Sequence, residues 1–260
     1  MKVIQVQLPQ KFNEIEIHTF ADEHIGDAQS DVKRIKERIA YVKEHPNAVC
    51  ILNGDIIDYA SRSSIGDIET RSLNIMDQLE KATELFQEIS DRIICITSGN
   101  HEFRSYKKEG IDFAKIFANA IGCSDYYSPA SAVLFIKFGK GKSPSRENNS
   151  TLVSIFVNHG SGGGRKEGAK AIRLADMASI VDTDIYIHSH THLPMIMKQG
   201  YYRTNFNAQT ITFVDKLFVN TAANLSYGGY GEAQEFKPAS MDTPVIYVQA
   251  KPSKKFWAKL

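Results

Sequence analysis

The stretch Ser98-Gly99-Asn100-His101-Glu102 directly follows the apolar run Arg92-Ile93-Ile94-Cys95-Ile96-Thr97, which is typical of a buried strand. A strand that ends at a glycine and then presents an amide and an imidazole offers a metal ligand and a proton donor at one edge of a sheet. Ligands of open α/β sheets bind at the carboxyl ends of the strands. We therefore expect the other chemically active residues of the chain to lie around this edge.

Apolar periodicity predicts alternating strands and helices on both sides of this stretch. The predicted strands before Pro194 are 14–21, 48–52, 92–97, 133–138, 152–158 and 184–187, and the predicted helices are 31–45, 73–89, 111–121 and 169–180. Such alternation indicates a largely parallel sheet with right-handed crossovers. Beyond Pro194 the pattern favours antiparallel strands over 195–198, 209–214, 217–221 and 245–249.

Composition excludes several classes of protein. The 260 residues carry 31 Lys and Arg against 30 Asp and Glu, so a net charge of +1 gives no global attraction to nucleic acid or anionic lipid. Residues 1–10 lack the pattern of a signal peptide, and no apolar run reaches membrane-spanning length, so we expect no membrane contact. The three well-separated cysteines, Cys50, Cys95 and Cys123, are interpreted as reduced thiols of a cytoplasmic protein.

Five predicted strand ends carry residues that bind metals or transfer protons. In chain order these are Asp22 and His24; Asp55 and Asp58; Asn100 and His101; His159; His190 and His192. Each alone has a plain structural explanation, since Asp58 fits a helix N-cap and Asn100 fits a turn. Their ordered occurrence at strand ends predicts one site. Imidazoles and carboxylates without thiolates suit Mn²⁺, Fe or Zn²⁺, and two ions roughly 3.5–4 Å apart would use the whole set.

This set of motifs resembles the calcineurin-like metallophosphoesterase superfamily, over about residues 17–192. The resemblance implies an α/β fold, a four-layer αββα sandwich with two mixed β-sheets flanked by helices. It implies a single domain over 1–260, with a motif-bearing core of about 14–221 and a basic C-terminal tail of about 251–260 that packs through its aromatic residues.

The resemblance also implies roles for individual residues. One metal ion would be held by Asp22, His24 and His192, the other by Asn100, His159 and His190, with Asp55 bridging them; Mn²⁺ is the expected metal. His101 would protonate the leaving oxygen, and Asp58 would orient it and raise its pKa. A metal-bound hydroxide would attack phosphorus in line, without a covalent enzyme intermediate.

The sequence also departs from the family pattern. Family members often have Gly before the His-x-His motif, where this chain has Ser189 and an additional His188, which we interpret as structural. The phosphoprotein phosphatase branch has arginines after the second block and before Gly-Asn-His-Glu. Tyr59 and Ser98 occupy those places here, so protein phosphatase activity is disfavoured.

The substrate is the least defined part of the prediction. Arg104, Arg165 and Lys166 are candidates for contact with substrate phosphate, and they are equally consistent with solvated surface charge. Lysines and arginines of a basic loop over 139–149 and of the C-terminal tail could follow a nucleic-acid backbone. We expect a phosphodiesterase or nuclease acting on nucleic acid or nucleotide diesters. The alternatives are a phosphomonoesterase of the protein or small-molecule kind and a non-catalytic interaction scaffold. The oligomeric state is left open.

Overall fold

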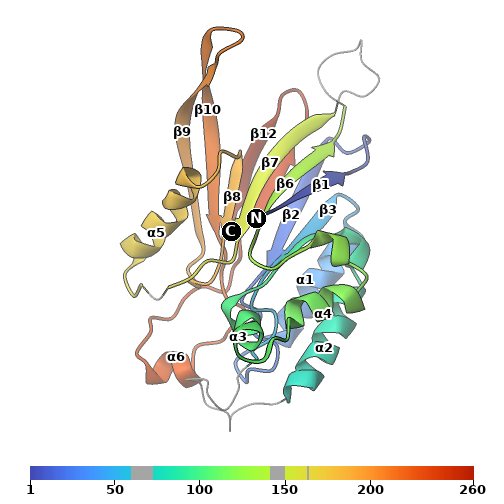
Figure 1. Cartoon of the computed structure of the whole chain (residues 1–260), viewed down its shortest axis with the longest axis vertical. Coiled ribbons are helices and arrows are strands. Elements are labelled where there is room, and N and C mark those ends of the chain that lie inside the picture. The colour runs from blue at the N-terminus through green and yellow to red at the C-terminus, as the bar shows by residue number, and fades with distance from the viewer. Residues whose placement is uncertain (60–72, 141–149, 163) are drawn as a thin grey trace.

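A computed structural model describes residues 1–59, 73–140, 150–162 and 164–260. Two six-stranded sheets pack face to face, and helices cover their outer faces (Figure 1). In spatial order the first sheet consists of β1 (Lys2–Gln7), β6 (Ser131–Phe138), β7 (Thr151–Asn158), β8 (Ile185–His188), β10 (Thr210–Asn220) and β9 (Met195–Asn205). The second consists of β12 (Lys255–Lys259), β11 (Val245–Gln249), β2 (Glu14–Phe20), β3 (Ala48–Asn53), β4 (Ile93–Thr97) and β5 (Tyr127–Ser128).

Both sheets contain parallel and antiparallel pairs. Strands β2, β3, β4 and β5 are parallel, while β11 and β12 are antiparallel additions at one edge. In the other sheet β7, β8 and β10 are parallel, and β9 returns antiparallel to β10. The helices are α1 (Val32–Glu44), α2 (Ile75–Gln87), α3 (Asn100–Glu109), α4 (Phe113–Ala120), α5 (Glu167–Asp176) and α6 (Gly229–Ala233). The expected sandwich of two mixed sheets flanked by helices is confirmed.

Three apolar clusters hold the layers together. The first lies between the two sheets, the second packs α1, α2 and α4 on the second sheet, and the third packs α5 on the first sheet. Strand β3 lies between two of these clusters, and all six of its residues are buried. This explains why its sequence is a continuous apolar run rather than an alternating one.

Helix α1 shows how the local sequence produces a covering helix. Ile35, Ile39 and Val42 recur at helical spacing and are buried against the second sheet. Asp31 caps its first turn, where its carboxylate accepts a hydrogen bond from the backbone N–H of Arg34 at 3.0 Å. The three cysteines are buried and unpaired, as expected.

The C-terminal segment differs from the expected tail. Residues 255–259 form the edge strand β12, antiparallel to β11. Phe256 joins the cluster between the sheets, and Trp257 stacks on Tyr247 with ring centroids 5.5 Å apart. The aromatic residues therefore do pack, but they do so from a strand. Lys255 and Lys259 are exposed because alternate residues of a strand face opposite ways, which places them on the face opposite Phe256.

Several other boundaries differ from the expectations. The short strands expected over 195–221 are two long strands of one hairpin, and the helix expected over 169–180 ends at Asp176 before a 3-10 turn. Strand β1 and helix α3 were not expected. The basic loop expected over 139–149 lies mostly outside the described residues. Among the helices that the structure describes, none is long and apolar enough to cross a membrane.

Candidate metal centre

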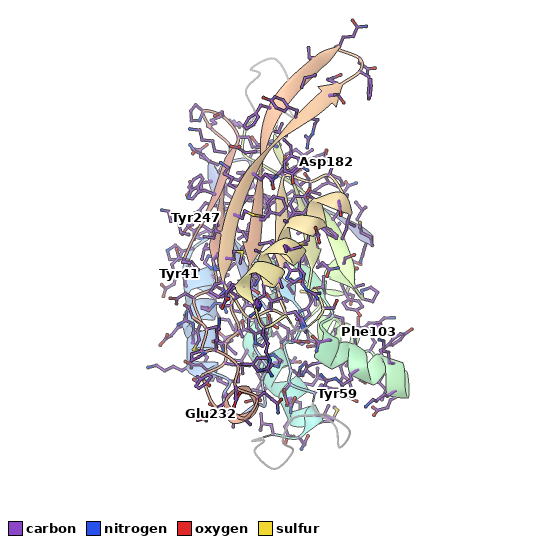
Figure 2. The ribbon with its side chains drawn as sticks, turned by 90° about the vertical axis from the view of Figure 1, so that its left-hand side faces the viewer. Tyr41, Tyr59, Phe103, Asp182, Glu232 and Tyr247 are labelled. Carbon is purple, nitrogen blue, oxygen red and sulfur yellow. The ribbon has the colours of Figure 1, made fainter. Side chains whose placement is uncertain are left out.

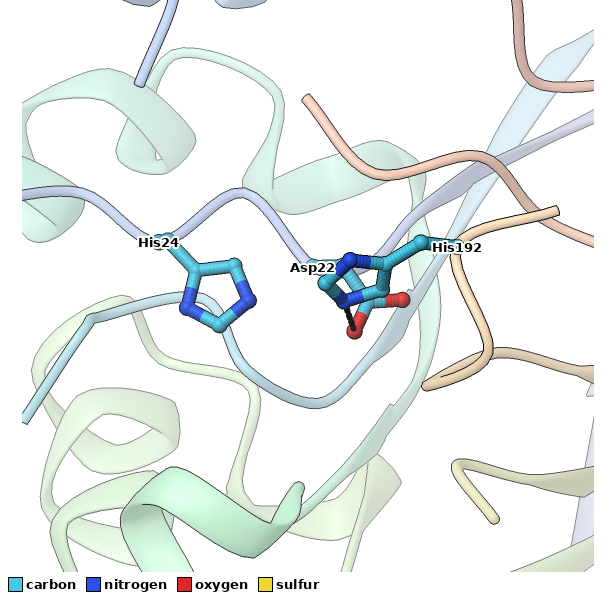
Figure 3. Close-up of side chains that lie close together, drawn as sticks. All are labelled: Asp22, His24 and His192. Carbon is cyan, nitrogen blue, oxygen red and sulfur yellow. Dashed lines mark hydrogen bonds and ion pairs between the residues drawn. The ribbon is translucent and has the colours of Figure 1, made fainter. Parts of the chain in front are cut away.

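The carboxyl ends of five strands from both sheets meet at one place. Residues after β2, β3 and β4 come from the second sheet, and residues after β7 and β8 come from the first. Within the described residues, potential ligand atoms form three groups whose members lie within 4.8 Å of one another: Asp22, His24 and His192; His24, Asp58 and His101; Asp55, His159 and His190. Figure 3 shows the first group, with His192 hydrogen-bonded to Asp22.

The backbone is strained at these residues. Five of them have φ between 45° and 64°, the left-handed region of the backbone that residues other than glycine rarely adopt: Asp22, His24, Asp55, His190 and His192. They make up five of the eight non-glycine residues with positive φ in the described part of the chain. Strain of this kind is maintained where the surrounding structure fixes it for a function.

Asp22 connects the two sheets. Its Oδ1 lies 3.1 Å from His192 Nε2, and its Oδ2 accepts a hydrogen bond from the backbone N–H of His190 at 3.0 Å. The carboxylate is fully buried, whereas the side chain of His192 is 38% exposed. The site is therefore closed on the Asp22 side and open to solvent at His192.

A backbone hydrogen bond fixes the ring of His159 so that its Nε2 faces side-chain oxygen atoms of the site. Its Nδ1–H donates to the Asn53 carbonyl at 2.6 Å, which leaves Nε2 facing the site. Nε2 lies 3.1 Å from Asp55 Oδ2, 3.2 Å from Asn100 Oδ1 and 3.9 Å from Asp22 Oδ1. Lone pairs from three residues thus converge on one nitrogen, an arrangement that a cation between them would stabilise.

Asp55 also binds the first turn of helix α3. Its Oδ1 accepts the backbone N–H of His101 at 2.8 Å, so the carboxylate lies at the positive end of the helix dipole. Gly99 makes this possible, because a Cβ there would overlap the Asp55 side chain and backbone. The glycine that ends β4 is thus required by the close approach of the Asp55 loop.

Glu102 holds the backbone of the loop that follows β3 and contains Asp55. It is buried, and its carboxylate accepts four backbone N–H groups at 2.7–3.3 Å, from Gly99, Asp55, Ile56 and Ile57. Burial and the Asp55 carboxylate raise the pKa of Glu102 above its ordinary value, so its ionised form depends on these donors. Sequence analysis included Glu102 in the motif but assigned it no role.

Asp58 lies between two imidazoles. Its Oδ1 is 3.5 Å from Nδ1 of both His24 and His101, and its backbone carbonyl accepts a hydrogen bond from His101 Nδ1–H. The second contact fixes the ring of His101 and leaves its Nε2 for other partners. These contacts suit the orienting role expected for Asp58, which stays a prediction.

The carboxylates control the protonation of the buried histidines. Burial by itself lowers the pKa of His24, but Asp58, Asp55 and Asp22 together raise it to about 9. Burial likewise lowers the pKa of His159, whereas Asp55 and Asp22 raise it to about 10. Without metal, both imidazoles are therefore protonated at neutral pH. A divalent cation that binds to His24 and His159 must displace these protons.

The remaining pKa shifts follow from the same charges. Burial raises the pKa of Asp22, but His192 and His159 lower it to about 2, and His159 holds the pKa of Asp55 well below its ordinary value. Burial and the charge of His159 lower the pKa of His190 to about 4. The carboxylates are thus ionised and His190 is neutral, which is the state that each needs as a metal ligand.

The donor set fits divalent metal ions. His24 Nε2 is buried and has no hydrogen-bond partner among the described residues, an arrangement that is costly unless the nitrogen binds something. The ligand atoms are imidazole nitrogens and carboxylate or amide oxygens, which suit Mn²⁺, Fe and Zn²⁺. His188 is buried nearby, with Nδ1 2.8 Å from Asn220 Oδ1, and this contact agrees with its expected structural role.

The basic residues expected to contact substrate are less closely tied to the site. The Arg165 guanidinium lies over the ring of Phe236, 5.2 Å from its centroid, Lys166 is exposed before α5, and Arg104 is half-buried on α3. Lys170, which sequence analysis missed, donates from Nζ to the carbonyl of Thr191 at 2.8 Å. Nothing in the amphipathic pattern of α5 distinguishes this lysine from its neighbours.

A family model described as calcineurin-like phosphoesterase matches residues 19–194, which include all nine strand-end residues from Asp22 to His192. The chain belongs to the calcineurin-like phosphoesterase family. The resemblance noted from the motifs is thereby confirmed. Members of this family use metal ions, and the groups of ligand atoms around Asp22 and around Asp55 are candidate sites for them in this chain.

Two solved structures are similar to this family member over nearly all of its length. One is a conserved uncharacterized protein from Streptococcus pneumoniae TIGR4, a predicted phosphoesterase, with 14% identity and a TM-score of 0.38; the alignment covers 95% of this chain and 98% of that one. The other is wild-type Vps29 complexed with Zn²⁺ from Entamoeba histolytica, with 12% identity, a TM-score of 0.36 and coverage of 94% and 98%. No curated protein matches the sequence.

Proposed function

We propose that this protein is a dinuclear metal-dependent phosphodiesterase or nuclease that hydrolyses nucleic acid or nucleotide diesters. The observation that carries the proposal is the convergence of Asp22 with His192 and of Asp55 with His159, each pair 3.1 Å apart and each joining the two sheets. Two ions held there, with His24, Asn100 and His190 completing the ligands, would activate water and bind the phosphoryl oxygens. Mn²⁺ is the proposed metal.

His101 supplies the proton for the leaving oxygen in this proposal. Its side chain is 19% exposed, so it lies at the open side of the site, and Asp58 holds its Nδ1. Nε2 is then free to donate to an ester oxygen as the bond to phosphorus breaks. The Asp58 carboxylate oxygen, 3.5 Å from His101 Nδ1, helps to keep the ring in this orientation.

The position after Asp58 favours diesters over monoesters. In the phosphatase branch that position carries an arginine, which suits the dianionic phosphate of a monoester. Here it is Tyr59, whose ring is 2% exposed and packs on Phe113, with its hydroxyl donating to Glu109 at 2.7 Å. Tyr59 is therefore directed into the core, and Ser98 is also buried. A diester carries a single negative charge and has less need of those arginines.

Arg104, Arg165 and Lys166 are the residues that we propose to bind the phosphates that flank the scissile one. Three buried, unpaired thiols favour a reducing compartment, so we propose that the protein acts in the cytoplasm.

The test compares turnover of bis-p-nitrophenyl phosphate with that of p-nitrophenyl phosphate. Protein stripped with a chelator is reloaded with Mn²⁺, Fe²⁺ or Zn²⁺, and metal content is measured in parallel. Asp55→Asn removes a carboxylate from the site. Asp182→Asn, at a carboxylate that pairs with Arg203 and Lys216, is the matched control for it. Preference for the diester supports the proposal. Preference for the monoester would replace it with a phosphatase, and no turnover with metal bound would indicate a non-catalytic scaffold.

A further inference from the structure

The hairpin of β9 and β10 extends beyond the rest of the first sheet. Strand β10 pairs with β8 only over Leu217–Asn220, so within the described residues 210–216 have β9 as their single neighbouring strand. Figure 1 shows the hairpin projecting past the end of β8, and Figure 2 shows the same hairpin extending at the top of the molecule. The candidate metal centre lies at the opposite end of β8, where His188 pairs with Asn220.

One face of this projecting hairpin is apolar. The register places Tyr202 opposite Phe213 and Thr204 opposite Ile211, and alternation puts these four residues on the same face. Tyr202 is 78% exposed, Ile211 68% and Phe213 59%, while Phe206 at the turn is 88% exposed. The Tyr202 and Phe213 rings contact each other edge to face, with centroids 5.7 Å apart.

This face continues the one that is buried between the two sheets. Leu217 lies four residues after Phe213 and therefore on the same face of β10. It belongs to the inter-sheet cluster together with Phe256 of β12. At the base of the hairpin, Lys198 Nζ lies 5.8 Å from the centroid of the Phe256 ring. Further along the hairpin, Tyr202, Ile211 and Phe213 are each more than half exposed. An apolar face that is covered in the body thus continues uncovered beyond it.

The charges on this face exclude an anionic partner. Its charged residues are Lys198 and Asp215, which pair with each other at 3.1 Å. Arg203 lies on the opposite face and pairs with Asp182 at 3.0 Å. A surface for nucleic acid or anionic lipid would be basic. This face is neutral, so two identical copies of it can meet without repulsion.

We propose that the apolar face of the β9–β10 hairpin is covered by the same face of a second copy of this chain. A two-stranded ribbon is marginally stable alone and needs a further layer against its apolar side, and a second copy supplies that layer wherever the protein is present. Taking about 200 Å² for each aromatic side chain, the exposed apolar residues present roughly 500 Å² per protomer. The dimer would then bury about 1,000 Å², which is the lower limit for a specific interface.

Sedimentation velocity over about 1–100 µM protein tests this directly, because an interface near the lower size limit predicts a dimer that forms with rising concentration. The double variant Tyr202→Ser, Phe213→Ser should stay monomeric. Ile172→Thr, at an isoleucine of α5 that is 63% exposed, should dimerise like the wild type. Circular dichroism checks that each variant is folded.

A wild-type protein that stays monomeric over this range overturns the proposal, and so does a double variant that dimerises like the wild type. Monomeric wild type that sediments with phosphatidylcholine vesicles would assign the face to membranes instead.

Cysteine crosslinking identifies the face independently of affinity. Thr204→Cys lies on the apolar face and Thr212→Cys on the opposite one, and both positions are exposed strand residues of the same hairpin. The chain's own three cysteines are buried. A short bismaleimide should link two copies of Thr204→Cys and leave Thr212→Cys monomeric. Equal crosslinking of both variants, or of neither, contradicts the proposed geometry.

Discussion

Replacement of Glu102 by Gln should be far more damaging than its size suggests. Gln has the same shape, but one carboxylate oxygen becomes an NH₂ group, and each oxygen of Glu102 accepts two backbone N–H bonds. Whichever oxygen is replaced, two N–H donors then face another donor. Hydrogen bonds to a charged acceptor contribute about 1.5–3 kcal/mol each. We therefore expect Glu102→Gln to lower the free energy of unfolding by about 3–6 kcal/mol.

Urea unfolding with saturating Mn²⁺ and with chelator measures this loss. Because the affected N–H groups include that of Asp55, the variant should also bind metal more weakly, so the stability gained from Mn²⁺ should be smaller than in the wild type. Glu84→Gln is the matched control, since this exposed glutamate of α2 pairs only with Lys81 in the described contacts and should change stability little. A Glu102→Gln protein within 1 kcal/mol of the wild type would refute the reasoning.

Three further predictions concern the candidate centre itself. His101→Gln should keep the wild-type metal content and lower turnover of bis-p-nitrophenyl phosphate about 10²–10⁴-fold; unchanged turnover would remove His101 from the chemistry. Asp55→Asn should lower the metal bound per chain, measured by mass spectrometry of the ions, while Asp182→Asn should retain it; equal metal content in both would show that Asp55 is no ligand. The third concerns pH. The raised pKa values of His24 and His159, about 9 and about 10, stabilise the metal-free fold fully below pH 6.5, and this contribution is lost as the pH rises through those values. Thermal unfolding of stripped protein should therefore occur at lower temperature at pH 9 than at pH 6.5, and a flat profile would contradict the assignment.

The candidate site could be predicted from sequence because its information is local. Each metal-binding or proton-transferring residue follows an apolar strand within a few positions, and parallel strands bring their carboxyl ends to one edge. The residue types then indicate the chemistry without knowledge of the packing. For the same reason the two-sheet sandwich followed from the family resemblance carried by these strand ends.

What the sequence did not reveal depends on contacts between distant segments. The support that Glu102 gives to Asp55 requires the loop after β3 to pass over the first turn of α3. Lys170 reaches Thr191 only because α5 packs beside β8. Strand β1 was missed because Lys2–Gln7 alternates weakly and is defined by its pairing with β6. The C-terminal segment was expected to be a tail because its lysines obscure the apolar pattern of the strand. The strand is defined by its pairing with β11.

The division of the ligands between the two sheets has a consequence for the order of folding. Asp22 and Asp55 belong to the second sheet, while the histidines they contact, His192 and His159, belong to the first. Neither sheet alone carries a complete set of donors, so ions can bind tightly only after the two have docked. A ligand that binds only one state of a protein shifts the equilibrium toward that state by mass action. Metal at this centre would therefore favour the docked pair of sheets over any form in which the two have separated.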